Sequence, residues 1–267
     1  MNSPALTAWI DGVGLLAPGI PDWSAAAKIL RGDQPCVAAP SQLPVPVLLP
    51  PAERRRASRI VKLVLALGLE ACQQAAADPG TLATVFSSSG ADGHNCHALC
   101  EQLATDDRQI SPTRFHNSVH NAAAGYWSIA VKAMNPCQVL SAYDASFGAG
   151  LLDALAQLRI EGQPILLVAY DGEYPEPLFS QRPIPDCGGV ALLLSPTPGD
   201  RSLARMTVQL SDQPADHLFD EALEKLRLSI PAMHSLPLLQ ALAAGHPSST
   251  IIDYLPPLQL AIDCQPC

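Results

Sequence analysis

Charged residues are scarce in this chain, and positive ones scarcest. Asp, Glu, Lys and Arg make up 15% of the 267 residues, and 25 acidic against 16 basic side chains give a formal net charge of −9. Binding to nucleic-acid phosphates requires a basic face. We therefore do not expect a general nucleic-acid binder. The hydrophobic content of 48% instead predicts a compact globular protein with a large core.

The chain also lacks the marks of a membrane or exported protein. It begins MNSPALTAWIDGVG, without a basic start, and Asp11 interrupts the apolar run, so we expect no secretory leader. The uncharged stretch 34–52 contains six prolines, which exclude a membrane-spanning helix there. We expect no membrane span. Eight cysteines without an export signal are expected to remain reduced thiols, which predicts a cytoplasmic location.

Strand and helix patterns alternate over the first 200 residues. Expected strands lie at 7–19, 81–89, 137–142, 164–173 and 187–196. Expected helices lie at 22–32, with Asp22 as the cap, and at 53–77, 94–107, 117–133 and from about 148 to 162. The alternation predicts an α/β layered core over residues 1–200. Residues 201–267 predict a short α+β extension on the same core, with a strand, two helices and a final strand pair.

Several segments, taken in order, resemble a known family. They are IDGVGLLAPG, RRRASRIVKLVLALGLEA, TVFSSSG, ISPTRFHNSVHNAAAGYWSIAVKA and SAYDASFGAGLLDALAQLRIEG. They are similar to the N-terminal half of β-ketoacyl-acyl-carrier-protein synthases, over residues 7–197. The resemblance implies a thiolase-like N-terminal half with a layered α-β-α core.

Ser146 marks the first departure from that family. When YDASFGAG is aligned on the family's nucleophile elbow, Ser146 stands in place of the nucleophilic cysteine. A thiolate is well populated near neutral pH, whereas an alkoxide needs a dedicated base. Ser146 is therefore either part of an inactive elbow kept for packing and pocket shape, or a nucleophile with His120 as its base. Phe147 beside it is a candidate gate of acyl-chain length.

The second departure is the short tail. The family's catalytic histidines, or a His/Asn pair, come from a C-terminal half that repeats the core topology, but only 67 residues follow residue 200. The surroundings of His217, His234 and His246 do not resemble the family's histidine motifs. We therefore expect that this chain alone does not catalyse decarboxylative condensation.

Within the family, the chain resembles the short ketosynthase-like proteins of aryl-polyene and xanthomonadin-type pigment pathways. This implies a chain-length-factor-like subunit of a type II polyketide or fatty-acid-like pathway, which needs no cofactor. Such a subunit pairs with a full-length ketosynthase and shapes the acyl pocket, and an acyl carrier protein docks nearby. The alternatives are a serine-dependent acyltransferase or thioester hydrolase using Ser146, and a homodimeric degenerate scaffold.

His116 and His120 have the i, i+4 spacing of a zinc-binding helix. The metalloprotease motif needs a Glu after its first histidine, and the amide of Asn117 cannot take up a proton. Zinc binding, structural hydrogen bonding and contact with a partner or acyl chain remain open for the two histidines. In the ketosynthase context, Asn117, Asn121 and Tyr126 are candidate pocket residues.

A basic run contains five of the sixteen basic residues within nine positions: Arg54, Arg55, Arg56, Arg59 and Lys62. It is either a solvated helix face or a docking surface for acidic carrier protein.

The segment HNCHALC, with His94, Cys96, His97 and Cys100, is either a metal site or ordinary helix surface. A second ligand pair of the usual spacing is missing nearby, so we predict no metal, although Cys264 and Cys267 form a distant pair.

Two further groups are open to more than one interpretation. Asp171 and Glu173 are either paired carboxylates or a polar cap on a strand. Gly125, Gly148 and Gly150 are expected to allow close packing.

Overall fold

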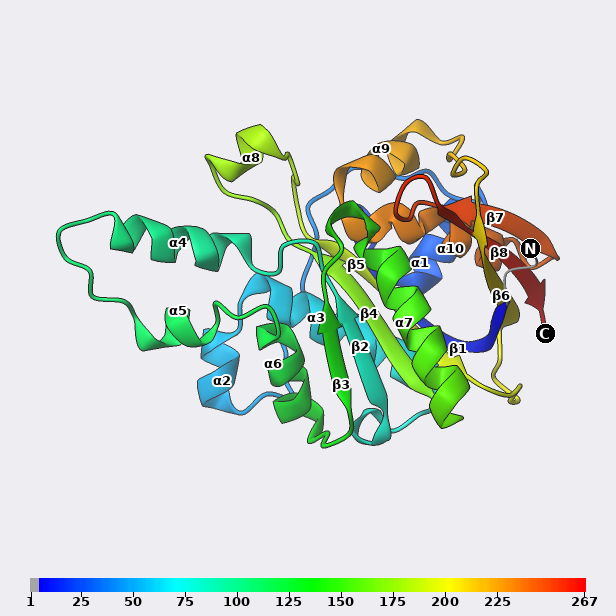
Figure 1. The fold of residues 1–267 in the computed structure, drawn as a ribbon, viewed down its shortest axis with the longest axis horizontal. Coiled ribbons are helices and arrows are strands. Elements are labelled where there is room, and N and C mark those ends of the chain that lie inside the picture. The colour runs from blue at the N-terminus through cyan, green and yellow to red at the C-terminus, as the bar shows by residue number, and fades with distance from the viewer. Residues whose placement is uncertain (1–4) are drawn as a thin grey trace.

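The computed structural model describes residues 5–267, which form a mixed eight-stranded sheet covered by helices on both faces (Figure 1). The strands are β1 (Leu6–Leu16), β2 (Ala83–Ser87), β3 (Cys137–Leu140), β4 (Ile165–Asp171), β5 (Gly188–Ser195), β6 (Ala204–Ser211), β7 (Ser248–Ile252) and β8 (Gln259–Pro266). They lie in the order β3-β2-β4-β5-β1-β6-β8-β7. β2 is parallel to β3 and β4, and all other neighbours are antiparallel.

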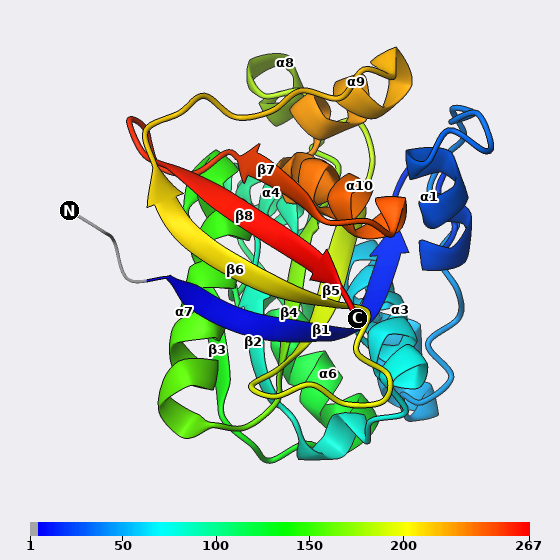
Figure 2. The ribbon, with the colours of Figure 1, turned by 90° about the vertical axis from the view of Figure 1, so that its right-hand side faces the viewer.

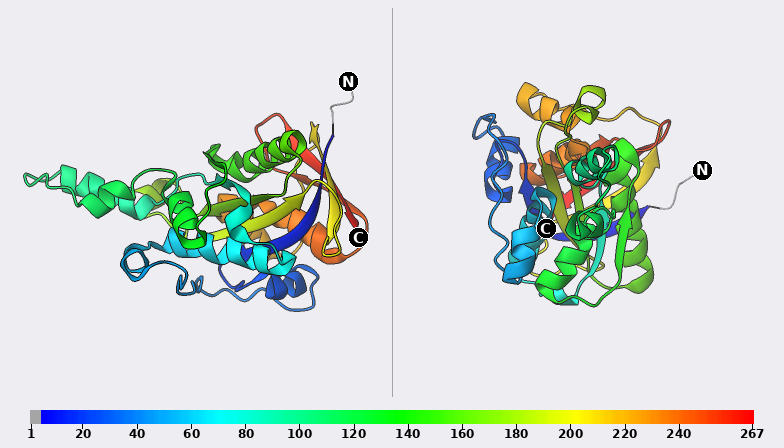
Figure 3. Two further views of the ribbon diagram at one scale, coloured as in Figure 1. Left: turned by 90° about the horizontal axis from the view of Figure 1, so that it is seen from below. Right: turned by 90° about the vertical axis from the view of Figure 1, so that its left-hand side faces the viewer.

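The α-helices are α1 (Trp23–Leu30), α2 (Pro51–Arg56), α3 (Arg59–Ala75), α4 (Gly93–Leu103), α5 (Pro112–His116), α6 (Ala122–Val131), α7 (Ser146–Glu161), α8 (Leu178–Gln181), α9 (Glu221–Ser229) and α10 (Leu236–Ala244). Three short 3-10 turns are η1 (Pro79–Thr81), η2 (Tyr143–Ala145) and η3 (Pro231–Ser235). Helices α4 and α5 project from one end of the molecule (Figures 1 and 3). Within residues 5–267, no helix is long and apolar enough to cross a membrane.

Strand β4 separates two hydrophobic cores. Because successive residues of a strand point to opposite faces, Ile165 and Leu167 join a core with α1, α7, α9, η3 and α10, whereas Leu166 and Val168 join a core with α3 and α6. All seven residues of β4 are buried, as the continuous apolar run predicts. The expected α/β layered arrangement is confirmed.

Helix α3 lies unusually close to β1. A Cβ atom on Gly12 would lie 2.1 Å from the Ala71 carbonyl oxygen, and one on Gly14 would lie 2.1 Å from the Leu67 carbonyl oxygen. Only glycine permits this approach. The approach lets α3 side chains accept hydrogen bonds from β1: Glu70 accepts the Leu15 N–H at 3.0 Å, and Gln74 accepts the Val13 N–H at 2.7 Å.

Two of the expected helices differ in the structure: one is divided and the other begins later. The helix expected at 53–77 is α2 followed by α3, because Ala57 is extended and the Ser58 hydroxyl caps α3 by accepting the Val61 N–H. The helix expected at 117–133 begins at residue 122, after the separate short helix α5, which Ser111 caps. Asp22 caps α1 as expected.

The glycine expectations are confirmed at two of three positions. A Cβ on Gly150 would lie 2.7 Å from the Ser87 hydroxyl, and one on Gly148 would lie 3.1 Å from the Asp253 carbonyl oxygen. Gly125 was expected to permit a close contact as well. It is exposed and nothing lies within 4 Å of the added atom, so that expectation was wrong.

The segment after residue 201 continues the same sheet. Strands β6, β8 and β7 extend it beyond β1, while α9, η3 and α10 add to the core that contains α7 (Figure 2). The predicted final strand pair is confirmed as the antiparallel pair β7–β8. Within this extension, η3 contacts η2, the turn that precedes α7, and so helps to build the candidate site.

Candidate functional site

Ser146 is the first residue of α7, and its hydroxyl is fully engaged by the turn that precedes it. Its Oγ donates a hydrogen bond to the Tyr143 carbonyl oxygen at 2.6 Å and accepts one from the Ala142 N–H at 3.0 Å. The residue is 1% exposed. Helix α7 begins here rather than at about Gly148 as expected, because η2 runs directly into it. The hydroxyl therefore serves the local backbone, as in a helix cap.

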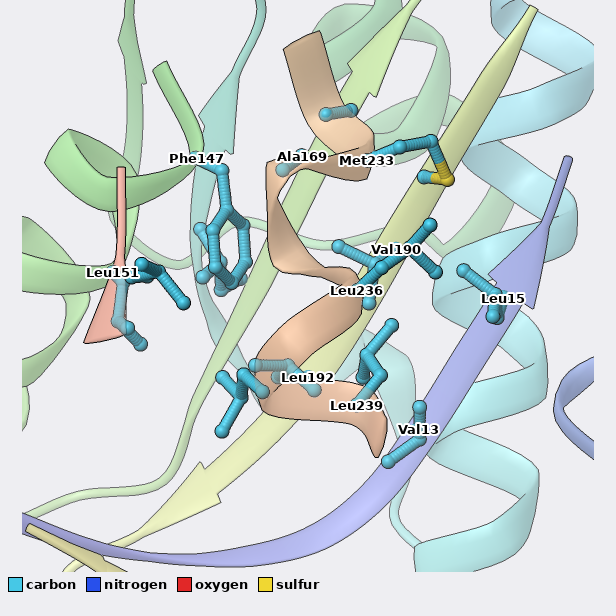
Figure 4. Packing of buried hydrophobic residues seen from close by; sticks show 14 of the residues in the cluster. Val13, Leu15, Phe147, Leu151, Ala169, Val190, Leu192, Met233, Leu236 and Leu239 are labelled. Carbon is cyan, nitrogen blue, oxygen red and sulfur yellow. The ribbon is translucent and has the colours of Figure 1, made fainter. Parts of the chain in front are cut away.

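Phe147, the expected chain-length gate, lies inside the core. It is fully buried and belongs to the same cluster as Leu151, Met233 and Leu236 (Figure 4). The side chain thus fills space between α7 and the C-terminal extension. From this position it can shape a pocket only by supporting its wall.

A cavity of about 790 Å³ adjoins the turn before Ser146. Its walls come from η2, from the loop after α8, from α9 and from η3. Tyr143, Asp144 and His234 are among the residues that line it. His234 was not among the candidate residues, because its surroundings do not resemble the family's histidine motifs. The packing of η3 against η2 brings it to this cavity. Burial lowers the pKa of His234, which favours the neutral imidazole.

Ion pairs surround this cavity. Arg182 pairs with Asp144 and stacks over the Tyr143 ring, with its guanidinium carbon 3.9 Å from the ring centroid. Arg227, 3% exposed, pairs with Glu224 at 2.7 Å, and hydrogen bonds from Arg227 lower the pKa of Glu224 to about 2. The charges near the cavity largely neutralise one another, so the site has no strong preference for an anion or a cation.

Asp171, at the end of β4, is a buried anchor rather than half of a carboxylate pair. Its Oδ1 accepts hydrogen bonds from the Ser89 N–H at 2.8 Å and from the Ser89 hydroxyl at 2.6 Å. Its Oδ2 accepts the Ala232 N–H at 2.9 Å. Burial raises the pKa of Asp171 to about 6 despite these donors. One carboxyl thus fastens both the loop after β2 and η3 to the sheet.

The candidate pocket residues before and within α6 lie elsewhere. His120 lines a small cavity with Asp92 and Tyr170, whereas the cavity beside the Ser146 turn is lined by His234. Asn117 accepts a hydrogen bond from the Tyr126 hydroxyl at 3.3 Å. Asn121 precedes α6 without capping it through its side chain. The structure therefore brings Asn117 and Tyr126 together, but it gives His120 no hydrogen bond to Ser146.

Some side chains of the basic run make hydrogen bonds or ion pairs within the chain, and others form no ion pair among the described residues. Arg54 donates to the carbonyl oxygens of Val47 and Leu49, at 2.8 and 3.0 Å, and so holds the proline-rich segment. Arg56 pairs with Glu53 at 3.4 Å, and Arg59 is paired with acidic residues elsewhere. Within the described part of the chain, Arg55 and Lys62 form no ion pair.

Arg59 occupies the centre of a cluster that has the donor set of a metal site. The ligand atoms of Glu173, Asp186 and Cys187 all lie within 4.8 Å of one another. The Arg59 guanidinium lies 2.7 Å from Glu173, 2.6 Å from Asp186 and 3.3 Å from the Cys187 sulfur. A cation from the chain itself therefore already balances these acids, and the cluster does not fit a metal ion. The HNCHALC residues on α4 do not converge in this way.

Comparison with known proteins decides the family. Residues 23–253 match the family model described as "Beta-ketoacyl synthase, N-terminal domain". The chain belongs to the β-ketoacyl synthase family. The resemblance seen in the sequence is thus confirmed. No match was found among the curated proteins.

Solved structures confirm that this β-ketoacyl synthase family member has the thiolase-like fold. A chain in the complex of the ketosynthase ApeO with its chain length factor ApeC from Xenorhabdus doucetiae has a TM-score of 0.74 and 22% identity, covering 97% of this chain and 99% of that one. A chain of the ishigamide ketosynthase/chain length factor has a TM-score of 0.72 and 15% identity, with the same coverage. A ketosynthase of the bacillaene synthase from Bacillus amyloliquefaciens has a TM-score of 0.57 and 14% identity, covering 79% of this chain and 47% of that one.

Proposed function

We propose that this chain is a non-condensing, chain-length-factor-like subunit that pairs with a full-length ketosynthase and helps to shape its acyl pocket. The observation that carries the proposal is that Ser146 is buried and that its hydroxyl is hydrogen-bonded to the backbone. A serine nucleophile needs an adjacent base and access to the substrate. Ser146 is buried, and its hydroxyl donates to a backbone carbonyl. Among residues 5–267, no histidine or carboxylate forms a hydrogen bond with it.

An open sheet edge supports the expectation of a protein partner. β3 is an end strand, and only β2 pairs with it among the residues described. Cys137 and Gln138 on this strand are exposed. Met134, just before it, is 95% exposed, and Ile129 on α6 is 46% exposed. An unpaired strand beside exposed apolar side chains favours pairing with a second chain. We assign this edge to the ketosynthase partner.

The likeness in fold to chains of ketosynthase and chain length factor complexes is consistent with this assignment. For the pocket, we propose the segment Asn117–Tyr126, including Asn121, whose two ends are joined by the Tyr126–Asn117 hydrogen bond. Phe147 belongs to the other core, on the opposite face of the sheet from this segment, so we do not include it in this pocket.

We propose that the carrier protein docks on the basic run, through those of its side chains that do not already hold the chain's own loops. Arg54 and Arg59 hold the chain's own loops, so the charges available to an acidic partner are those of Arg55, Arg56 and Lys62. The pairing of Arg56 with Glu53 is exposed and solvent-screened, so it can open for a partner.

The test is to replace Ser146 with alanine and assay the chain together with a full-length ketosynthase from the same organism. With carrier-protein-bound substrates, condensation should stay within about twofold of wild type, since a hydroxyl that caps a turn takes no part in chemistry. Ser141→Ala, nearby and exposed, is the matched control. If Ser146→Ala alone abolished turnover of an acyl thioester, the chain would instead be a serine-dependent acyltransferase or hydrolase.

A further inference from the structure

The two end strands of the sheet, β3 and β7, differ in whether another segment occupies the outer side of the strand. β3 is open, as described above. β7, at the opposite end, is also paired with only one strand of the described sheet, β8. A chain with two open edges could associate at both, and repeated head-to-tail contacts of that kind produce open-ended assemblies rather than a closed pair.

The backbone of β7 is occupied on its outer side by the segment that follows β6. The Ile251 N–H donates to the Asp216 carboxylate at 2.8 Å, and the Asp216 N–H donates to the Ile251 carbonyl oxygen at 2.8 Å. The Thr250 hydroxyl donates to the same carboxylate oxygen of Asp216 at 2.9 Å. Asp216 thereby satisfies both backbone groups of Ile251, one of the two residues of β7 whose backbone faces outward.

Asp216 contacts β7 at a residue whose backbone groups a further strand would need for pairing. In an antiparallel pair, alternate residues direct their N–H and C=O groups away from the partner strand. In β7 these are Ser249 and Ile251, and the strand has only five residues. An incoming strand would have to displace the Asp216 contacts to form its hydrogen bonds to Ile251, and it would meet the negative charge of the carboxylate.

We infer that Asp216 closes the β7 edge and so limits this chain to one strand-pairing partner, leaving β3 as the edge that pairs. The association that it prevents is pairing of β7 with a strand of a second copy of this chain. The inference does not depend on the proposed function, because it concerns the chain in the absence of any ketosynthase.

The test is static light scattering of the purified chain over a range of concentrations. Wild type should hold one constant mass. Asp216→Ala frees the Ile251 N–H, and its mass should rise with concentration to at least about twice that of wild type. Asp212→Ala removes an exposed charge four residues away and should behave as wild type. Asp216→Asn keeps an acceptor oxygen and should also behave as wild type.

A second variant separates edge pairing from simple unfolding. Proline at position 249 removes an outward-facing N–H and blocks strand pairing at an edge. In the double variant Asp216→Ala/Ser249→Pro, the mass should return to the wild-type value. A constant mass for folded Asp216→Ala, or growth that persists in the double variant, would overturn the inference.

Discussion

At the scale of single residues, buried polar groups hold the candidate site together. Asp171 joins the loop after β2 to η3, and Ser146 closes the turn before α7. In each case a side chain satisfies backbone groups that would otherwise be buried without partners, at a cost of about 1–3 kcal/mol each. Asp171 and Ser146 therefore act as structural anchors.

Glu70 predicts a specific dependence of stability on pH. Its carboxylate accepts the N–H groups of Leu15 and Trp23, and burial raises the pKa of Glu70 to about 7, against an ordinary value of 4.5. Because the folded pKa is the higher, the stabilising contribution of its protonation is complete below about pH 4.5 and is lost as the pH rises through about 7.

Glu70→Gln removes this titration. The difference in unfolding free energy between wild type and Glu70→Gln, measured by urea denaturation, should shift in favour of wild type as the pH falls from 7 to 4.5. A difference that stays constant over this interval would show that Glu70 does not titrate there.

Sequence reasoning identified some of these residues and missed others. The sequence pattern places Ser146 in a turn between a strand and a helix expected from about Gly148, and the structure makes it the first residue of that helix. The role of His234 could not be found in the same way, because its nearness to η2 arises from the packing of an extension about 90 residues further along the chain. Asp171 was placed correctly at a strand end, but its hydrogen-bond donors Ser89 and Ala232 come from segments that are distant along the chain.

At the scale of secondary-structure elements, the contact between α3 and β1 is so close that it leaves no room for a side chain at Gly12 or Gly14. Gly14→Ala would place a methyl group 2.1 Å from the Leu67 carbonyl oxygen, so α3 must shift away from β1. We expect a loss of about 1–3 kcal/mol in unfolding free energy. Gly125→Ala is the control: the site is open, and the change should stabilise α6 by up to about 1 kcal/mol. Equal effects of the two changes would contradict the close-packing account.

The exposed side of α6 gives a second prediction at this scale. Ile129→Lys introduces a charge on the exposed side of α6, the helix that precedes β3 in the chain, and should weaken ketosynthase binding about tenfold or more, measured by calorimetric titration. Leu228→Lys on α9, also at an exposed apolar position, should leave affinity unchanged. The thermal midpoints of both variants should match wild type. Equal affinities for the Ile129→Lys variant and wild type would remove α6 from the interface.

Most helices and strands could be predicted from the sequence, but the residues at which they begin and end could not. Buried strands such as β4 and β5 appear as continuous apolar runs, and the final pair β7–β8 was foreseen. The break between α2 and α3 depends on one capping contact of Ser58, which competes with an otherwise uninterrupted helical pattern.

At the scale of the whole molecule, one sheet runs from the open β3 edge to the closed β7 edge. The order of the strands could not be derived from local patterns, because it depends on which segments pair across the chain. The family resemblance supplied the layered architecture, while the way in which the short extension continues the same sheet emerged only from the structure. The open β3 edge and the engagement of Ser146 in a turn are the two observations on which the proposed pairing with a ketosynthase rests.

The most direct test of this account is to co-express the chain with a full-length ketosynthase and measure the mass of the product by size-exclusion chromatography with light scattering. The account predicts a one-to-one complex whose condensing activity is lost when this chain is omitted. A chain that stays a monomer or homodimer in the presence of the ketosynthase, with condensation unaffected by its absence, would contradict it.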